Sequence, residues 1–408
     1  MTPTAPPAPR TPAAPRTTPT TVLLAPDKFK GTLSAAEVID ALARGIRESA
    51  PQVELLSCPI ADGGDGTVDA ALAAGSELRS STVTGPTGEP RTARWALSGQ
   101  TAVLELAEVV GLRALPGRTL APGAASTRGL GELILAAVEA GASTVMVGLG
   151  GSSSTDAGAG LLQGLGAHLL TADGAVIAPG LDGLTSLASV DLAPARTALD
   201  GVALIAASDV TNPLVGPDGA AAVYGPQKGI PEADIDHADG VLAAAAEVLD
   251  PDAAFRDAPG AGAAGGTGFA LFLLGAEQRS GADAVFELAD VDALLERADV
   301  VVTGEGKLDE QTLHGKGPAE IARRAHGRGL PVAAVAGAVT LDDDLLHAAG
   351  IVRAWDLTSR AGSVQEAMEN TGTWLTEVGR DLGVWLMSGP TAEELAAEEP
   401  IAGASSAR

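Results

Sequence analysis

Five glycine-containing loops hold the residues of this 408-residue chain whose types and spacing are suited to chemistry on a charged ligand. They span residues 25–31, 61–66, 148–158, 208–213 together with 224–229, and 303–317. Each sets glycine beside charged or hydroxyl groups after a short apolar run that is typical of a buried strand. In open parallel sheets, ligands bind at the carboxyl ends of the strands. The loops are therefore expected to form one ligand site.

The lysines are confined to these loops. All five lie there, and every other basic residue of the chain is an arginine; the lysines are Lys28, Lys30, Lys228, Lys307 and Lys316. A lysine ammonium is a compact point charge suited to phosphate. We expect at least two of the five to contact a phosphate or carboxylate group of a ligand.

Carboxylates follow the same loops. They are Asp27, Asp62, Asp65, Asp156, Asp209, Glu305 and Asp309. Oxygen ligands of this kind suit Mg²⁺, which usually takes one or two carboxylates together with substrate phosphates. Each acid also has an ordinary structural explanation, such as a helix cap at Asp65 or an Asx-turn at Asp209. Taken together, lysines and acids on shared loops indicate phosphoryl transfer, in which catalysis is mostly positioning and charge neutralisation.

The loop at residues 148–158 combines Gly150 and Gly151 with three consecutive serines, Ser152 to Ser154. Glycine allows a close approach of the backbone to a ligand, and exposed N–H groups beside hydroxyls favour an anion such as phosphate. A tight strand-to-helix turn capped by Ser or Thr is the alternative interpretation. This loop alone does not decide between them.

Familiar nucleotide-binding signatures do not explain the chain. Gly306-Lys307 is followed by leucine and Gly315-Lys316 by glycine, so no Walker A motif is present. A G-x-G-x-x-G match at residues 260–265 has no strand leading into it. We interpret that segment as a turn or a close backbone approach, which gives little support to a dehydrogenase.

Composition excludes several classes of protein. The formal charge of −26 argues against nucleic acid as a partner, and the apolar runs are too short to cross a membrane. The single cysteine, Cys58, excludes a disulfide framework within the chain. No signal-like apolar segment occurs in residues 1–19. We expect a cytoplasmic protein with a small-molecule substrate, its oligomeric state open and a homodimer among the arrangements.

Alternating strand and helix patterns predict an α/β fold with parallel sheets. A capping box at Ser34 and Glu37 predicts a helix through Glu48, and short alternating runs between residues 81 and 106 indicate antiparallel strands. We expect a discontinuous three-layer, Rossmann-like domain with a second, mixed α/β domain inserted. The predicted boundaries are a disordered tail at 1–19, the first domain at 20–78 and 290–388, the inserted domain at 79–289, and a loose tail at 389–408. The cleft between the domains is the default ligand site.

Several motifs in order resemble the bacterial type I glycerate kinases. They are Ala25-Pro-Asp-Lys-Phe-Lys-Gly-Thr-Leu-Ser34, Ala61-Asp-Gly-Gly-Asp-Gly-Thr67, Gly148-Leu-Gly-Gly-Ser-Ser153, Ser208-Asp-Val-Thr-Asn-Pro-Leu214, Tyr224-Gly-Pro-Gln-Lys-Gly229, and Gly304-Glu-Gly-Lys-Leu-Asp309 with Gln311-Thr312 and Gly315-Lys316. The resemblance spans about Thr21 to Leu386. It implies ATP-dependent phosphorylation of D-glycerate with Mg²⁺ on a two-domain α/β fold. Two departures concern positioning: Asp65 replaces an expected glutamate, and Ser154-Thr-Asp-Ala157 replaces an Asn-Asp-Gly pattern.

On this resemblance the site residues receive hypothetical roles. The catalytic candidates are Lys28, Lys30, Asp62 and Asp209, of which Asp62 and Asp209 are also candidate metal ligands. The candidates for substrate binding are Asp27, Asp65, Asn212, Glu305 and Asp309. The candidates for nucleotide binding are Gly150, Gly151, Ser152, Ser153, Lys228, Lys307 and Lys316.

Two alternatives stay open. A sugar-acid binding protein would use the same loops without ATP, although a binder of carboxylates gains little from so many nearby acids. A small-molecule kinase of another hydroxy acid would share the chemistry. The resemblance favours 2-phosphoglycerate over 3-phosphoglycerate as the product.

Overall fold

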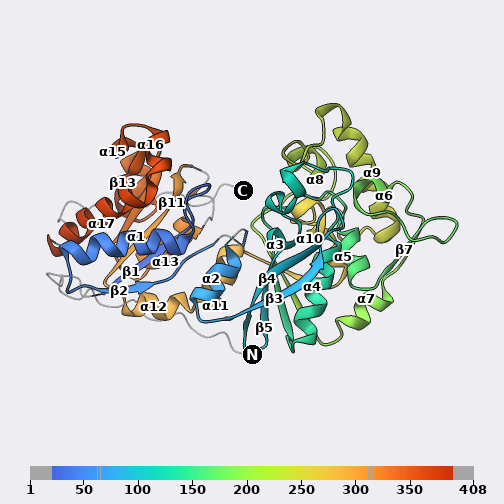
Figure 1. The fold of residues 1–408 in the computed structure, drawn as a ribbon, viewed down its shortest axis with the longest axis horizontal. Helices are drawn as coiled ribbons and strands as arrows, with labels where there is room; N and C mark the ends of the chain where they lie inside the picture. The colour runs from blue at the N-terminus through green and yellow to red at the C-terminus, as the bar shows by residue number, and fades with distance from the viewer. Residues whose placement is uncertain (1–20, 62, 65, 311, 314–316, 389–408) are drawn as a thin grey trace, which may run out of the picture. The chain divides into compact units, whose positions relative to one another are not determined.

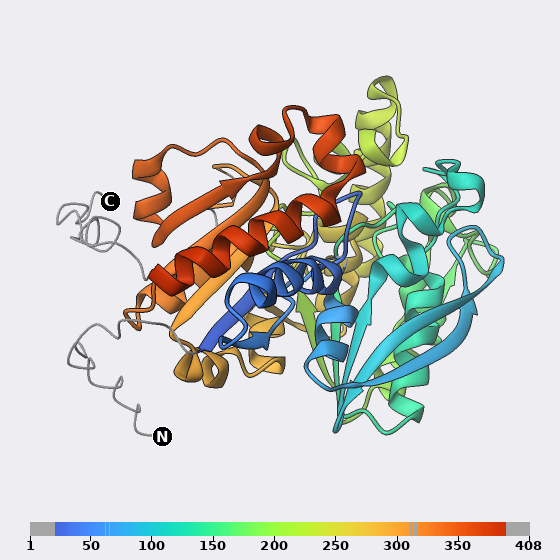
Figure 2. The same ribbon diagram turned by 60° about the vertical axis from the view of Figure 1, so that its left-hand side comes forward.

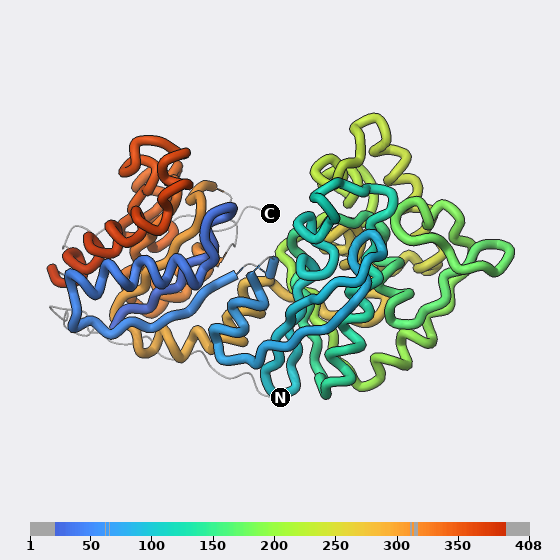
Figure 3. The backbone as a smooth tube through the Cα atoms, in the orientation of Figure 1, coloured from blue at the N-terminus to red at the C-terminus, as the bar shows by residue number. Residues whose placement is uncertain are grey.

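The computed structural model describes residues 21–61, 63–64, 66–310, 312–313 and 317–388. The predicted tails at 1–19 and 389–408 lie outside the described residues, as do the candidates Asp62, Asp65 and Lys316. The chain forms two compact units (Figure 1), one made of the described residues up to Ile60 and from Phe286 onward, the other of Ala61–Val285. Figure 3 traces this discontinuity, since the first unit takes its segments from both ends of the colour scale. The predicted two-domain α/β class is confirmed.

The division between the units differs from the predicted boundaries. The second unit begins at Ala61, earlier than the predicted residue 79. The reason is α2 (Thr67–Ala73), which packs against β4 (Pro90–Ser98) and β5 (Thr101–Glu105) and so belongs to the core of the second unit. The change of pattern near residue 81 marks an antiparallel hairpin inside that unit.

The first unit contains a parallel sheet with the strand order β13-β12-β11-β1-β2. Its strands are β1 (Thr21–Pro26), β2 (Glu54–Ser57), β11 (Val300–Leu308), β12 (Val332–Val339) and β13 (Ile351–Asp356). Its helices are α1 (Ala35–Ser49), α12 (Val291–Arg297), α13 (Gly317–His326), α14 (Asp343–Ala348), α15 (Leu357–Ala361), α16 (Val364–Glu369) and α17 (Thr371–Ser388).

Both faces of this sheet are covered, so every residue of β1 is buried. Val22 and Leu24 belong to the core shared with α1 and α17, whereas Leu23 points to the opposite face because side chains alternate along a strand. Figure 2 shows α1 and α17 side by side. A Cβ atom on Gly45 would clash with the backbone of α17, so glycine permits this close packing. The predicted capping box at the start of α1 is confirmed.

β11 is longer than the sequence indicates. The prediction ends this strand at Thr303 and makes the following residues a loop, but the strand continues to Leu308. Glu305 pairs with Ala336 and Lys307 with Ala338 of β12. Both charged side chains therefore project from an ordered strand end.

The second unit contains a six-stranded sheet with the order β10-β9-β6-β5-β4-β3, in which the first four strands are parallel and β3 and β4 antiparallel. Its other strands are β3 (Glu77–Thr84), β6 (Thr144–Gly148), β9 (Ala203–Ala207), β10 (Glu277–Arg279) and the separate pair β7 (His168–Leu170) and β8 (Ser189–Asp191). Its other α-helices are α3 (Leu106–Val110), α4 (Arg128–Glu139), α5 (Ala159–Gly164), α6 (Gly180–Leu184), α7 (Ala193–Ala198), α8 (Ala220–Tyr224), α9 (Ile235–Leu249), α10 (Thr267–Leu273) and α11 (Gly281–Leu288), whose last residues pass into the first unit. The 3₁₀ helices are η1 (Leu112–Ala114), η2 (Pro116–Arg118), η3 (Pro226–Lys228), η4 (Glu232–Asp234) and η5 (Ala263–Gly265).

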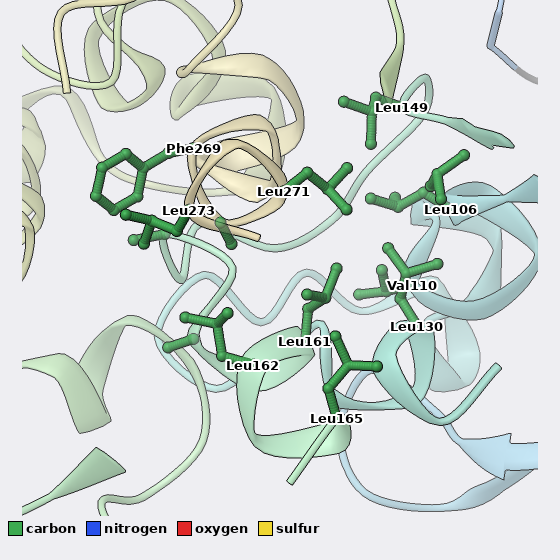
Figure 4. Close-up of a cluster of buried hydrophobic side chains, with 14 of the residues drawn as sticks. Leu106, Val110, Leu130, Leu149, Leu161, Leu162, Leu165, Phe269, Leu271 and Leu273 are labelled. Carbon is green, nitrogen blue, oxygen red and sulfur yellow. The ribbon is translucent and has the colours of Figure 1, made fainter. Parts of the chain in front are cut away.

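The core of the second unit is built largely from aliphatic side chains. Leu106 of α3, Leu130 of α4, Leu161 of α5 and Phe269 of α10 are fully buried in it. Figure 4 shows Leu106, Leu130 and Leu161 pointing toward one another, while the ring of Phe269 lies on the opposite side of α10. Full burial of such a side chain stabilises the fold by about 1.5–3 kcal/mol. This core supports the glycine-rich loop between β6 and α5. No helix in the described segments has the length and apolar character needed to span a lipid bilayer.

Candidate functional site

The carboxyl ends of four parallel strands lie along one edge of the second unit's sheet. The strand register places Glu105 beside Gly148, Gly148 beside Ala207, and Arg279 beside Ala207. The segments that follow β5, β6, β9 and β10 therefore leave the sheet at the same edge, which is where parallel sheets bind ligands.

Gly63 lies over this edge. A Cβ atom added to Gly148 would come within 2.7 Å of the carbonyl oxygen of Gly63, and one added to Gly63 would lie 3.0 Å from the carbonyl oxygen of Ala207. Glycine at both positions allows the backbone at Gly63 to lie directly on the ends of β6 and β9. The candidates Asp62 and Asp65, on either side of Gly63, lie outside the described residues.

Glu105 is a site residue that the sequence reasoning missed. Its side chain is 3% exposed; one carboxylate oxygen accepts a hydrogen bond from the N–H of Gly66 at 2.8 Å and the other accepts from the N–H of Val68 at 3.2 Å. The carboxylate thus satisfies backbone donors at the start of α2. The feature of the sequence that could have indicated Glu105 is its position inside the apolar run of residues 102–110.

The glycine-rich loop after β6 is accessible only at its beginning. Gly150 is half-buried and Gly151 exposed, whereas Ser152 and Ser153 are buried. The N–H and the hydroxyl of Ser153 both donate to the carbonyl oxygen of Val110, at 2.8 and 2.7 Å. The donors of Ser153 are therefore committed to protein backbone, and the exposed backbone of the loop is that of the two glycines.

Asp156, farther along this loop, is 0% exposed and fully hydrogen-bonded. It accepts from the N–H and hydroxyl of Thr127 at 2.8 and 2.9 Å, and from the N–H groups of Gly158 and Gly160 at 3.2 and 3.3 Å. Burial raises the pKa of this carboxyl, while the four hydrogen bonds oppose the rise. Asp156 therefore has a structural role, because its hydrogen bonds join the start of α4 to the start of α5.

Lys228 lies beneath the loop and not at the surface. The side chain is 2% exposed, and its Nζ donates to the carbonyl oxygen of Ser154 at 2.7 Å. Burial lowers the pKa of the ammonium to about 7, with the negative charge of Asp156 acting in the opposite direction. The ammonium therefore serves the loop's backbone in this structure.

Asp209 and Asn212 follow β9. Asp209 is exposed, and its Oδ1 accepts from the N–H of Gly281 at 3.2 Å. Asn212 is half-buried; it accepts from the hydroxyl of Tyr224 at 2.7 Å and donates to the carbonyl oxygen of Asp218 at 2.8 Å. One carboxylate and one oriented amide thus lie in the loop that leaves the same sheet edge.

In the first unit, Asp27 and Lys28 directly follow β1. The N–H of Asp27 donates to the carbonyl oxygen of Gly304 at 2.7 Å, so β11 fixes this residue. The Asp27 carboxylate accepts from the N–H of Lys28 at 2.6 Å, and its Oδ1 lies 3.6 Å from Lys28 Nζ. Phe29, which follows Lys28, is buried and anchors this part of the chain. Lys28 is thus a mostly buried ammonium held beside a carboxylate.

The end of β11 adds a second set of charged side chains next to the residues that follow β1. Lys307 Nζ lies 3.1 Å from Asp309 Oδ2, and the side chain of Glu305 is buried. Lys30 is exposed. A Cβ atom added to Gly306 would lie 3.3 Å from the backbone nitrogen of Lys30. The loop after β1 therefore packs on the extended end of β11.

Each unit thus gathers part of the predicted site. The first unit brings together Asp27, Lys28, Lys30, Glu305, Lys307 and Asp309, and the second unit brings together Gly150, Gly151, Ser152, Ser153, Asp209 and Asn212. Within the described ranges, no three His, Cys, Asp or Glu side chains are grouped closely enough to hold a metal ion. A site for Mg²⁺ needs fewer protein carboxylates, since substrate phosphates supply other oxygens. The exposed carboxylate of Asp209 fits that requirement.

Comparison with known proteins gives concordant matches. The sequence model described as "Glycerate kinase family" matches residues 22–387. A "Glycerate 2-kinase" of Escherichia coli is 40% identical over 90% of this chain and 98% of its own length, and a "Glycerate kinase" of Bacillus subtilis is 39% identical over 88% and 96%. A crystal structure described as a glycerate kinase 2 of Salmonella typhimurium superposes with a TM-score of 0.77 at 37% identity, covering 90% of this chain and 98% of that one.

Proposed function

The chain belongs to the glycerate kinase family, and on that premise we propose that it transfers the terminal phosphoryl group of ATP to the 2-hydroxyl of D-glycerate with Mg²⁺. The observation that carries the proposal is the family match across residues 22–387, which includes all the motif loops. The relative described as a glycerate 2-kinase, at 40% identity, favours the 2-hydroxyl over the 3-hydroxyl.

The first unit supplies cationic groups in this proposal. Lys28 and Lys30 bind the transferring phosphoryl group or the glycerate carboxylate, and Lys307 and Lys316 bind ATP. The support is that Lys28 is mostly buried and held in place by Asp27, because a preorganised charge stabilises developing negative charge more than a mobile one. The neighbouring acids contact the substrate; they are Asp27, Glu305 and Asp309.

The second unit supplies the phosphate-binding loop and the acids. The loop at Gly150–Ser153 approaches the phosphates of ATP through the exposed backbone of Gly150 and Gly151, while buried Ser153 holds the loop to Val110. Asp209 or Asp62 accepts the hydroxyl proton of glycerate or binds Mg²⁺, while Asn212 and Asp65 orient the substrate. Bound Mg²⁺ supplies neutralisation of the phosphate charge. Tyr224 supports the role of Asn212, because its hydroxyl fixes the orientation of the amide.

Release of ADP tests the proposal. The purified chain is incubated with Mg²⁺ and ATP, with and without D-glycerate, and ADP is followed by a coupled assay. We expect ADP release that requires both D-glycerate and Mg²⁺ and that stops on addition of a chelator. ADP release at the same rate without D-glycerate would contradict the proposal, as would strong D-glycerate binding with no ADP formed.

A further inference from the structure

Lys228 is a charged residue that lies in the interior of the second unit. It ends η3, is 2% exposed, and ranks among the largest fully buried side chains of the described chain. A buried ammonium costs free energy unless it is hydrogen-bonded and paired with a negative charge. The structure provides both, and both belong to the loop between β6 and α5.

The hydrogen bond goes to the backbone of that loop. Lys228 Nζ donates to the carbonyl oxygen of Ser154 at 2.7 Å. Ser154 follows directly on Gly150 to Ser153, the residues to which the proposed function assigns the phosphates of ATP. The side chains of Ser154 and Thr155 are buried beside it, and their hydroxyls have no hydrogen-bond partner among the described residues. The backbone contact to Lys228 is therefore a principal polar restraint on this part of the loop.

The compensating charge is Asp156, two residues farther on. Its negative charge favours the protonated form of Lys228. The carboxylate is itself fixed by hydrogen bonds from Thr127, Gly158 and Gly160. Two buried, opposite charges thus connect the loop to η3 on one side and to the starts of α4 and α5 on the other.

A turn of backbone encloses the ammonium. A Cβ atom added to Gly265 would lie 2.9 Å from Lys228 Nζ and would clash with the carbonyl oxygen of Ser154. The carbonyl oxygen of Gly265 accepts from the N–H of Ala157 at 3.0 Å. Glycine at this position is what allows the backbone to close against Lys228 and the loop together.

We propose that Lys228 is a positioning residue that acts through the carbonyl of Ser154 to hold Gly150–Ser153 in the conformation that binds ATP phosphates. Asp156 is its compensating charge. Lys228 itself does not contact ATP, which distinguishes it from Lys307 and Lys316. This inference rests on the proposed function for the identity of the ligand, and on the buried contacts for the role of the lysine.

Chemical labelling of the wild-type enzyme tests the inference without a mutation. Because the chain has only five lysines, reductive methylation can be mapped to each one by mass spectrometry. Exposed Lys30 and Lys307 are expected to react quickly, and Lys228 at least about tenfold more slowly, to the same extent with and without Mg²⁺-ATP. Labelling of Lys228 as fast as that of Lys30 in the absence of ATP would overturn the inference.

A double-mutant cycle tests the coupling to the loop. Lys228→Met and Asp156→Asn each leave one buried charge uncompensated, whereas the double variant carries neither. We expect the combined loss in kcat/KM for ATP to be at least about fivefold smaller than the product of the two single losses. Losses that multiply would overturn the proposed pairing. Arg79→Met, at an exposed ion pair with Glu77, is the control that leaves activity unchanged.

The kinetic constants separate positioning from a purely structural role. In the folded fraction of Lys228→Met, KM for ATP is expected to rise at least about fivefold while KM for D-glycerate changes less than about twofold. Unchanged constants in that fraction would mean that Lys228 only stabilises the fold. If the single variant does not fold, wild-type labelling still decides whether Lys228 is enclosed. If the wild type does not phosphorylate glycerate, the labelling result stands separately, so the two failures are distinguishable.

Discussion

The carboxylate of Glu105 accepts a hydrogen bond from the N–H of Gly66 at 2.8 Å. A buried acid at the end of β5 therefore holds the loop that carries the second family motif. The same residue lies beside Gly148 in the strand register, where the glycine-rich loop begins. One residue thus holds one motif loop through its side chain and lies, through its backbone, beside the start of another.

Replacing Glu105 with alanine is expected to weaken both the fold and the reaction. The backbone donors at Gly66 and Val68 would lose their buried acceptor, which costs about 1–3 kcal/mol in the free energy of unfolding. We also expect kcat/KM to fall at least about tenfold, because the motif loop loses its anchor. Urea denaturation and steady-state kinetics measure the two effects. Glu77→Ala, at a side chain that is 63% exposed, should change neither, and wild-type kinetics in Glu105→Ala would contradict the anchoring role.

Lys28→Ala is expected to abolish turnover while the protein stays folded. The ammonium is held beside Asp27 at a strand end, and loss of one preorganised charge at a phosphoryl group costs at least about 10²-fold in kcat. The comparison variant is Arg47→Ala, in the last turn of α1. Circular dichroism verifies folding in both. Turnover of Lys28→Ala at the wild-type rate would reject a role for this lysine in catalysis.

Asp209→Asn separates an acidic role from a merely polar one, because the amide keeps the size of the side chain and removes its charge. We expect kcat to fall at least about 10²-fold and the Mg²⁺ concentration for half-maximal activity to rise if this carboxylate is a metal ligand. A fall in kcat at an unchanged Mg²⁺ requirement would assign it to proton transfer. Asp200→Asn, in an exposed turn, is the matched control. Wild-type kinetics in Asp209→Asn would remove the residue from the site.

The buried ammonium of Lys228 predicts a pH dependence of stability. Burial lowers its pKa from 10.5 to about 7, so between these values the unfolded chain binds more protons than the folded one. The free energy of unfolding therefore rises with pH in this window, by up to about 1.4 kcal/mol per pH unit. Lys228→Met lacks this contribution, so the stability difference, wild type minus variant, should grow from about pH 7.5 to about pH 9.5.

Urea denaturation of both proteins at each pH measures that difference. Cys58 contributes a slope of opposite sign above pH 9, since burial raises the pKa of its thiol to about 12. This contribution is common to both proteins and cancels in the difference. A stability difference that is independent of pH would contradict the depressed pKa of Lys228.

Local patterns in the sequence predict the framework of the fold well. The capping box at Ser34 and Glu37 fixes the start of α1, and the apolar run at Val22–Ala25 forms a strand buried on both faces. Parallel strands then bring their following loops to one edge, which is why lysines and acids far apart in the chain could be grouped within each unit. The glycines at residues 260–265 do form a turn with no strand leading into it.

Burial was the property that the sequence could not supply. Lys228 lies in a glycine-containing loop like Lys28 and Lys30, and only tertiary packing against Ser154 and Gly265 distinguishes it from them. Glu105 was missed because an acid in an apolar run gives no indication of the backbone donors that reach it from another segment. The extension of β11 likewise depends on its pairing with β12, which local propensity does not encode.

The position of the phosphoryl group in the product tests the central claim most directly. Proton-coupled ³¹P NMR of the product formed from D-glycerate, ATP and Mg²⁺ distinguishes the two esters, because the phosphorus couples to one proton at carbon 2 and to two protons at carbon 3. The account predicts a new phosphate-ester doublet that grows together with ADP. A triplet would place the phosphate on the 3-hydroxyl, and the absence of any new ester signal would contradict glycerate phosphorylation itself.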